Sequence, residues 1–391
     1  MSFNRRKFFK LSGAGVAGAV LTNVAHGKIV KPSSLLSPSK IIYRKLGNTG
    51  IELPIVSLPV ERIDNAKFID LAIEAGVKYF DTAYTYANGK SEPFLGNALK
   101  PYKRESLIIS TKINTKDKEN PEKELLEKFE TSLKRLQTDY VDILFLHAVN
   151  NRDETLNERH IKVFQDLKKQ GKARFIGVST HTNMAEVITA ATESKVWEVI
   201  LTTYNFRTME NPQNVTNAID KAAKAGIGII AMKTMTGVYL DKEKTRKINT
   251  TAALKWALNN PNITTAIPGI TSFEQLNDDL KLLSDITLTE QEKQDLAKDG
   301  NTAGLFCLGC DQCRRQCPNN VPIPDMMRAY MYAYGYNSTL QANQVLQELA
   351  PEQISCDKCA ECIVECTQKF NIREKVLDIS RLRAVPEEFL V

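Results

Sequence analysis

Eight cysteines lie in the last quarter of the 391-residue chain, in two copies of one spacing. Each copy reads C-x2-C-x2-C-x3-C, a compact run typical of [4Fe–4S] ligation, in which the fourth cysteine of each run binds the other cluster. The first run is Cys307, Cys310, Cys313 and Cys317, and the second is Cys356, Cys359, Cys362 and Cys366. The sequence therefore predicts two [4Fe–4S] clusters with crossed ligands. One would be held by Cys307, Cys310, Cys313 and Cys366, the other by Cys356, Cys359, Cys362 and Cys317.

Two other chemistries also use groups of cysteines. Structural zinc sites bind four thiolates, but their ligands are usually split into separated pairs. A disulfide framework is disfavoured because every cysteine of the chain lies inside the two runs. The cysteine pattern thus favours a protein that transfers electrons.

The first residues predict export. Arg5 and Arg6 are followed by the apolar, uncharged stretch LSGAGVAGAVL, and a basic start before a short apolar run is typical of a secretory signal. The paired arginines indicate the twin-arginine route, with a disordered basic start as the alternative. We expect a signal at residues 1–27 and a Ser/Pro-rich linker at 28–40. The expected location is the periplasm, or the membrane where the signal stays uncleaved.

The net charge of +6 has a local origin, because the first 45 residues are rich in Lys and Arg and contain no Asp or Glu. The rest of the chain is close to neutral. No nucleic-acid partner is therefore expected.

Residues 41–288 alternate short apolar runs with amphipathic stretches, such as 121–136 and 211–225, that predict helices. A further helix is expected at 289–298, after the last of these runs. Eight such units predict an α/β fold, a parallel (β/α)8 TIM barrel. A doubly wound open sheet is the alternative, but no G-x-G-x-x-G follows any run. The runs are IVSLPV, VKYFDTA, SLIISTK, VDILFLHA, ARFIGVST, WEVILTTY, IGIIAMK and ITTAIPG.

Residues 289–391 are expected to form a second, smaller domain that carries the cysteines. The stretch 322–354 between the two runs predicts two helices that break near 335–338. This wide separation resembles the helical dicluster ferredoxin modules of respiratory and heterodisulfide-type oxidoreductases. The tyrosines of 330–336 are expected to pack around the clusters.

The active site of such a barrel lies at the carboxyl ends of its strands. The polar candidates there are Asp81, Lys112 and His147, with Tyr86 in the loop after Asp81. The surrounding sequence resembles the aldo-keto reductases over about residues 41–285, and a subgroup of that family carries a C-terminal two-cluster module. The motifs that carry the resemblance are KLGNTGIELPIVS (45–57), DTAYTYANGKSEPFLGNAL (81–99), STK (110–112), LHA (146–148) and GVS (177–179).

The resemblance implies a catalytic tetrad of Asp81, Tyr86, Lys112 and His147. Tyr86 would donate a proton to the developing alkoxide and His147 would orient the carbonyl. Lys112, held by Asp81, is expected to lower the pKa of Tyr86 toward neutrality.

The resemblance also implies NAD(P) as cofactor. Its contacts would be Ser179, Met232, Lys233, Gly269, Gln275 and Asp279. The chain departs from the family pattern where a lysine and an arginine often bind the 2′-phosphate of NADPH, because Gly269 and Gln275 carry no charge. Leu201 stands where the family usually has a glutamine that binds the carboxamide. The first strand ends in residues 59–62 where the family has a glycine pair, and this change is expected to reshape the mouth of the substrate site.

Two functions follow. The first is an exported oxidoreductase that exchanges hydride between a small carbonyl or alcohol substrate and a nicotinamide, with electron transfer through its clusters to a membrane or soluble partner. The second is an electron-transfer or binding protein whose barrel no longer uses nicotinamide.

Overall fold

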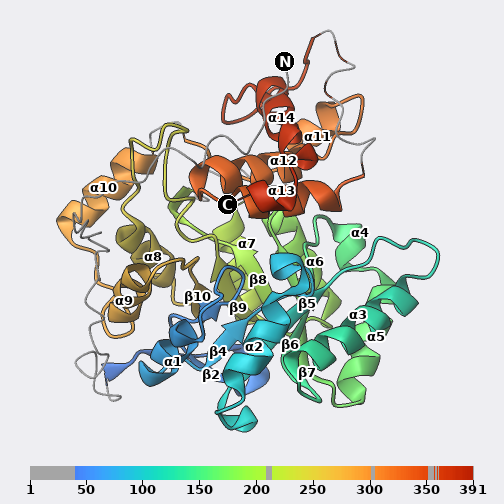
Figure 1. Cartoon of the computed structure of the whole chain (residues 1–391), viewed down its shortest axis with the longest axis vertical. Coiled ribbons are helices and arrows are strands. Elements are labelled where there is room, and N and C mark those ends of the chain that lie inside the picture. Colours follow the sequence, from blue (N-terminus) through green and yellow to red (C-terminus); the bar gives the residue numbers. More distant parts are fainter. Residues whose placement is uncertain are drawn as a thin grey trace, which may run out of the picture. The chain divides into compact units, whose positions relative to one another are not determined.

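All eight apolar runs form strands of one parallel sheet, as predicted (Figure 1). Successive strands pair in chain order, and the backbone of Val56 bridges in parallel to Ala266 of the last strand, which closes the sheet into a barrel. The Ser57 N–H donates to the Ala266 carbonyl at 2.9 Å across this seam. The strands are β3 (Leu58–Pro59), β4 (Tyr79–Asp81), β5 (Ile108–Ile113), β6 (Val141–Leu146), β7 (Ala173–Thr180), β8 (Val199–Thr203), β9 (Gly228–Met232) and β10 (Thr265–Ile267).

The structure is a computed structural model and describes residues 40–207, 214–300, 304–350, 356, 359 and 361–390. These residues belong to one unit, Pro32–Val391. The predicted signal at 1–27 and nearly all of the predicted linker lie outside the described residues. No helix in the described part of the chain has both the length and the apolar character needed to cross a membrane.

The strands are buried on both faces. Every residue of β5 and β6 is buried, as expected for a parallel sheet covered by helices, and their β-branched content favours the extended backbone. A hairpin that the sequence analysis did not predict, β1 (Tyr43–Lys45) with β2 (Glu52–Pro54), precedes the barrel. Leu46 and Leu53 from this hairpin join the cluster inside the barrel with residues such as Phe145, so the hairpin closes one end.

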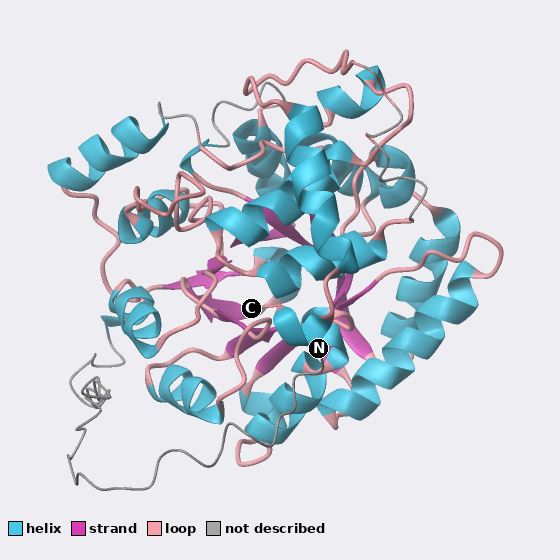
Figure 2. Cartoon of the chain, turned by 45° about the horizontal axis from the view of Figure 1, so that its top comes forward, coloured by secondary structure: helices cyan, strands magenta, loops and turns pink. Residues whose placement is uncertain are grey.

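Helices surround the barrel (Figure 2). Helix α3 spans the residues predicted for it; Pro121 begins it and Gln137 ends it in a left-handed conformation. The predicted helix at 211–225 is observed from Val215, because Asn214 has left-handed backbone angles and caps the helix by accepting from the Asn217 N–H; residues 211–213 lie outside the described residues. The outer helices are α1 (Ala66–Glu74), α2 (Ser91–Leu99), α3 (Pro121–Leu136), α4 (Arg152–Thr155), α5 (Glu158–Lys169), α6 (Met184–Ser194), α7 (Val215–Lys224), α8 (Thr250–Leu258), α9 (Phe273–Lys281) and α10 (Glu290–Gly300).

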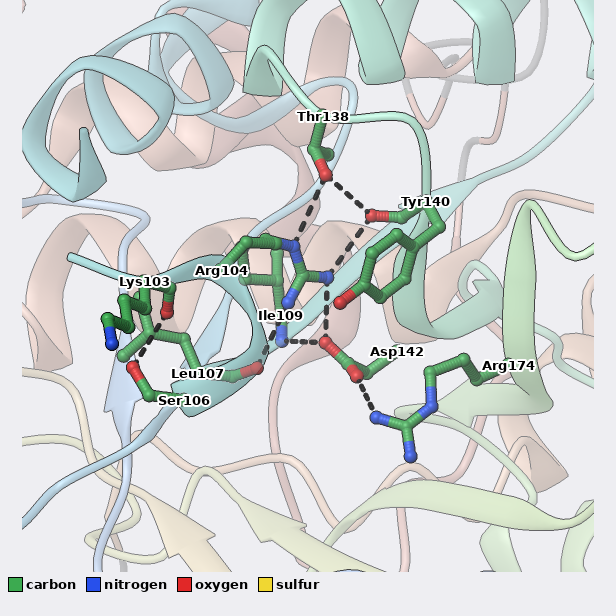
Figure 3. A network of polar contacts seen from close by, with 9 residues as sticks. All are labelled: Lys103, Arg104, Ser106, Leu107, Ile109, Thr138, Tyr140, Asp142 and Arg174. Carbon is green, nitrogen blue, oxygen red and sulfur yellow. Dashed lines mark hydrogen bonds and ion pairs between the residues drawn. The ribbon is translucent and has the colours of Figure 1, made fainter.

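A buried carboxylate ties together the amino-terminal ends of three strands (Figure 3). Asp142 on β6 accepts hydrogen bonds from the Ile109 N–H at 2.9 Å and from Arg104 at 2.8 Å. Arg174 of β7 contacts its other oxygen at 2.5 Å. Because the Asp142 side chain is fully buried and shared by two cations, it fixes the register of β5, β6 and β7 at the end away from the predicted active site.

The cysteine-bearing part of the chain, as far as described, contains four α-helices, although Cys313 is the one cysteine of the eight that lies within a helix. The predicted break near 335–338 is confirmed, and a π-helical turn, Met331–Gly335, precedes it. The helices are α11 (Gln312–Gln316), α12 (Ile323–Tyr330), α13 (Thr339–Glu348) and α14 (Ile372–Ser380). We call residues 304–390, as far as described, the helical module.

The helical module lies against the carboxyl ends of the barrel strands (Figure 1). The Asn183 N–H, after β7, donates to the Gly309 carbonyl at 2.7 Å, and the Val238 N–H, after β9, donates to the Gly335 carbonyl at 2.8 Å. Helix α10, which the predicted boundary at residue 289 places in the second domain, packs instead on α8 through a Lys255–Glu292 ion pair at 2.8 Å.

Candidate active site

A buried ion pair connects the ends of β4 and β5. The Nζ atom of Lys112 donates to Asp81 Oδ2 at 2.6 Å and to the Thr82 carbonyl at 2.7 Å. The other carboxylate oxygen of Asp81 accepts from the Ser110 hydroxyl at 2.6 Å. Both charged side chains are almost completely buried, so each depends on the other for compensation.

Tyr86 and His147 lie next to this pair, so the structure brings the four predicted catalytic residues together. The Lys112 Nζ lies 4.4 Å from the centre of the Tyr86 ring. The rings of Tyr86 and His147 meet edge-on with centroids 5.9 Å apart. Tyr86 begins a short helical turn, Tyr86–Gly89, in which Ala87 has a φ of 51°.

The pKa of Tyr86 does not follow the sequence prediction. It is well above its ordinary value, chiefly because of burial, and the negative charges of Glu61 and Asp81 raise it further. Among the described residues Lys112 makes no hydrogen bond to the Tyr86 hydroxyl, since its ammonium is committed to Asp81 and Thr82. Burial therefore outweighs the effect expected from Lys112: the pKa of Tyr86 does not fall toward neutrality, and Tyr86 stays protonated at neutral pH.

His147 is a neutral imidazole at neutral pH. Burial is the main cause that holds the pKa of His147 well below its usual value, and the nearby charge of Lys112 adds to it. A neutral imidazole still has one N–H to donate. The site therefore presents two uncharged proton-bearing groups, Tyr86 and His147, above a fixed ammonium.

A cavity of about 210 Å³, which we call the barrel cavity, opens beside Tyr86. Four of the predicted cofactor residues line it, together with residues of the strand-one end that the sequence predicted to reshape the mouth. The cofactor residues are Met232, Lys233, Gly269 and Gln275, and the strand-one residues are Pro59, Glu61 and Arg62.

The remaining predicted cofactor contacts lie outside the lining of the barrel cavity. The Ser179 hydroxyl accepts from the Ala148 N–H at 3.0 Å and so positions the backbone next to His147. Asp279 on α9 is buried, and its Oδ2 has no hydrogen-bond partner among the described residues. Leu201 is fully buried in the apolar cluster inside the barrel and presents no polar group to a ligand.

The helical module supplies part of the cavity wall, which the sequence analysis missed. Tyr336, Asn337 and Gln341 line the barrel cavity, and Tyr332 lines a neighbouring cavity of about 50 Å³ with Tyr86. Tyr332 also belongs to the apolar core of the helical module that contains Cys313 and Cys356, and Tyr336 packs against that core, so both pack in the cysteine-bearing module as predicted and face the barrel site as well. Their four-residue spacing was the available signal, because residues four apart share one helix face.

The thiols near Cys307 and those near Cys356 each include one cysteine of the other run. Burial raises the pKa of Cys307, and the nearby thiols of Cys313, Cys310 and Cys366 raise it further. The same four cysteines line one small cavity of about 20 Å³. Around Cys356, whose pKa burial raises to about 11, the nearby thiols are those of Cys317, Cys362 and Cys359.

None of the eight cysteines forms a disulfide, which is against the alternative of a disulfide framework. Polar hydrogens point at two of the sulfur atoms: the Gly309 N–H at 3.4 Å from Cys307 Sγ and the Asn319 amide at 3.0 Å from Cys359 Sγ. Among the described residues, no three His, Cys, Asp or Glu side chains are arranged around one point as ligands of a metal ion.

The first cysteine run touches the barrel site. Cys307 and Gly309 line a cavity of about 20 Å³ together with His181 and Lys233. Lys233 also lines the barrel cavity with Tyr86, and His181 lines the neighbouring cavity with Tyr86 and His147. Arg328 likewise lines the cavities of Cys307 and of Tyr86, so His181, Arg328 and Lys233 connect the first cysteine run to the Tyr86 site.

Known proteins share the barrel. The Aldo/keto reductase family model matches residues 50–251. L-galactose dehydrogenase from Arabidopsis thaliana is 26% identical over 302 residues, a match that covers 66% of this chain and 93% of that protein. The solved structure of the thermostable aldo-keto reductase Tm1743 is 26% identical with a TM-score of 0.54, covering 66% of this chain and all of the other. The holo form of aldo-keto reductase AKR11C1 from Bacillus halodurans shares the fold, with a TM-score of 0.55 at 22% identity over 66% of this chain and 96% of the other.

Proposed function

Because this chain belongs to the aldo/keto reductase family and is an oxidoreductase of that type, we propose that it exchanges hydride between a carbonyl or alcohol substrate and a nicotinamide while two [4Fe–4S] clusters carry single electrons. The observation that carries the proposal is the shared wall between the two chemistries. Lys233 lines both the cavity of Tyr86 and the cavity of Cys307.

In the direction of reduction, the hydride that turns the C=O group into an alcohol would come from a reduced nicotinamide bound in the barrel, which would be oxidised in exchange. The chain's residues manage the proton and the charge. The Tyr86 hydroxyl gives its proton to the carbonyl oxygen, and the neutral His147 imidazole donates a hydrogen bond that orients that oxygen. In oxidation the same two groups act in reverse.

Lys112 stabilises the state in which Tyr86 has given up its proton. Its ammonium lies under the ring and is fixed by Asp81 and the Thr82 carbonyl. A fixed charge of this kind needs no reorganisation when negative charge develops beside it. Tyr86 regains a proton from solvent after each turnover.

The barrel cavity fits a nicotinamide nucleotide. Met232 and Lys233 would lie against the nicotinamide ring and Ser179 beside its carboxamide. Gly269 leaves open space, since a Cβ built on it meets no atom within 4 Å. Asp279, with its unpartnered buried oxygen, would accept a hydrogen bond from the adenine amino group. No cation stands at Gly269 or Gln275, so NADP is expected to bind no better than NAD.

The cysteines fit the clusters by their donor chemistry. Cys307, Cys310, Cys313 and Cys366 would hold one cluster, and Cys356, Cys359, Cys362 and Cys317 the other. A cysteine binds iron as the thiolate, so iron takes the place of the thiol proton even where burial has raised the pKa of the thiol. N–H groups directed at the sulfur atoms stabilise the thiolate form. The four thiolates of a [4Fe–4S] cluster lie farther apart than the ligands of a single metal ion, because the cluster is larger than one ion. The finding that no three described side chains surround one metal-ion position is therefore compatible with a cluster.

Metal and sulfide analysis tests this proposal. Anaerobically prepared protein should contain about eight irons and eight acid-labile sulfides per chain. Because the ligands cross, Cys366→Ser should lose the same EPR signal as Cys310→Ser, and Cys317→Ser should lose the other. Zinc without sulfide would exclude the clusters, and loss of the same signal in Cys317→Ser and Cys310→Ser would exclude the crossed pairing.

Mass spectrometry of small molecules that co-purify tests the nicotinamide. NAD in the barrel supports the hydride mechanism. A protein that neither carries nor binds NAD(H) or NADP(H) would instead be an electron carrier built on a reductase barrel.

The proposal includes export to the periplasm with the clusters already in place, supported by the basic and apolar residues at 5–21. Replacing Arg5 and Arg6 by lysines should retain the protein in the cytoplasm with full iron content. Undiminished export of the double-lysine variant would contradict the twin-arginine route.

A further inference from the structure

The barrel cavity contains two cations whose charges take no part in the proton transfer of the proposed mechanism. Arg62 follows strand β3 and Lys233 follows β9, and both line the cavity with Tyr86. Among the described residues neither forms an ion pair with a carboxylate. Lys233 instead lies over the rings of Tyr332 and Tyr336, 4.1 and 5.5 Å from their centres.

Burial of the two side chains disfavours their charged forms. Burial lowers the pKa of Lys233; the negative charge of Glu61 opposes this, and the nearby charges of Arg328 and Arg62 add to it. Burial likewise lowers the pKa of Arg62, again opposed by Glu61. Glu61 is the single acidic residue of the cavity lining, so one carboxylate faces two cations there, without a direct ion pair among the described residues. The lining therefore carries an excess positive charge that an anionic ligand would neutralise.

The position of the cations separates them from the expected nucleotide phosphates. Arg62 and Lys233 lie close to Tyr332 and Tyr336 of the helical module, on the side of the cavity that Tyr86 shares with that module. The phosphate end of a nucleotide is expected instead near Gly269 and Gln275, at the start of α9. The excess charge thus belongs to the part of the cavity where a carbonyl substrate would lie.

We propose that the substrate is a carboxylate-bearing carbonyl compound, whose acid group binds Arg62 and Lys233 while its carbonyl oxygen meets Tyr86 and His147. This inference rests on the proposed reductase function. Arg62 offers the planar, paired donors that suit a carboxylate, and Lys233 adds a point charge. The polar side chains of Thr234, Asn337 and Gln341 in the same lining favour a substrate with further hydroxyl groups.

A matched pair of aldehydes tests the proposal on the complete, anaerobically prepared enzyme. 4-Carboxybenzaldehyde and benzaldehyde differ only in the remote acid group. The native enzyme should prefer the acid, and Arg62→Met should lower the ratio of their kcat/KM values by roughly 10- to 100-fold, the worth of a hydrogen-bonded charge pair. Arg62→Lys should keep part of the preference. Lys244→Met removes an exposed lysine bonded to Asn337 and should leave the ratio unchanged.

Binding measurements test the acid site independently of catalysis. Calorimetric binding of 4-carboxybenzyl alcohol and benzyl alcohol tests the acid site even where neither aldehyde is turned over. No preference for the acid in binding or turnover would overturn the inference, while reduction of both aldehydes would leave the reductase function standing. Weaker NADH binding in Arg62→Met with an unchanged acid preference would also overturn it, because the cations would then belong to the nucleotide.

Discussion

The ammonium of Lys112 lies against the ring face of Tyr86, 4.4 Å from its centre, while Asp81 receives its hydrogen bond. This placement gives Asp81 and Lys112 separate tasks. Asp81 keeps Lys112 charged inside the barrel, and Lys112 supplies a fixed field to the ring. Because Lys112 contacts the ring of Tyr86 and not its hydroxyl, the hydroxyl keeps its proton and remains available to the cavity.

Tyr86→Phe should lower carbonyl reduction by about 10²–10⁴-fold, because it removes the proton donor and keeps the ring. Single-turnover hydride transfer measures the effect. Tyr140→Phe is the matched control, since Tyr140 stacks with Arg104 at the opposite end of the barrel strands and its change should leave the rate intact. An unaltered rate in Tyr86→Phe would assign the proton to another donor.

The pH profile of kcat/KM for reduction should be flat from about pH 6.5 to about pH 10. Tyr86, whose pKa lies above its ordinary value near 10, keeps its proton over this range, and His147, whose pKa lies below about 6.5, stays neutral. A loss of activity with an apparent pKa between about 7 and 9 would show that Tyr86 ionises more easily than its surroundings imply.

Asp279→Asn should stabilise the protein at pH 7. Burial raises the pKa of Asp279 well above its ordinary value, so the native state binds the proton more tightly than the unfolded state. This group therefore lowers stability as the pH rises above about 4. The asparagine should gain about 1–3 kcal/mol in unfolding free energy at neutral pH.

The gain in Asp279→Asn should vanish below about pH 4, where the native aspartate is protonated and resembles the amide. Denaturant unfolding at several pH values measures it. The neighbouring Asp278→Asn is the control, because Asp278 is half-exposed and paired with Lys281. Equal gains in both variants would point to net charge rather than to burial of Asp279.

Gly309→Ala should weaken the contact between the first cysteine run and the barrel. Gly309 has a φ of 64°, and a Cβ there would meet the His181 carbonyl oxygen at 2.4 Å. Gly171→Ala is the matched control, with a φ of 74° and nothing within 4 Å, so it measures the backbone strain alone. Gly309→Ala should cost about 1–3 kcal/mol more than the control in unfolding free energy. Equal losses would show that the contact yields without cost.

The strands were predictable because each strand of a parallel sheet covered by helices is buried on both faces. Burial on both faces requires a continuous apolar run in the sequence. Helix α3 was predictable to the residue, since Pro121 can begin a helix but not continue one. The hairpin β1–β2 was not, because three-residue strands such as YRK and ELP show no periodicity.

The candidate site was predictable in its members and less so in its energetics. Strand ends and motif order located Asp81, Tyr86, Lys112 and His147. The pKa of Tyr86 depends on how deeply the ring is buried and on which group takes the charge of Lys112, and both depend on contacts between distant segments. The contribution of Tyr336 was likewise hidden, because a tyrosine in an apolar helix gives no sign of which surface it covers.

The barrel cavity has exposed lining at Gly269, Thr271 and Asn337, whereas Met232 at its other end is nearly inaccessible. The β1–β2 hairpin closes the far end of the barrel and the helical module covers the near one. Two reactants that share one passage cannot exchange independently. Whichever of them lies deeper must arrive first and depart last, so turnover should follow a compulsory sequence, and release of the innermost product sets the upper limit on its rate.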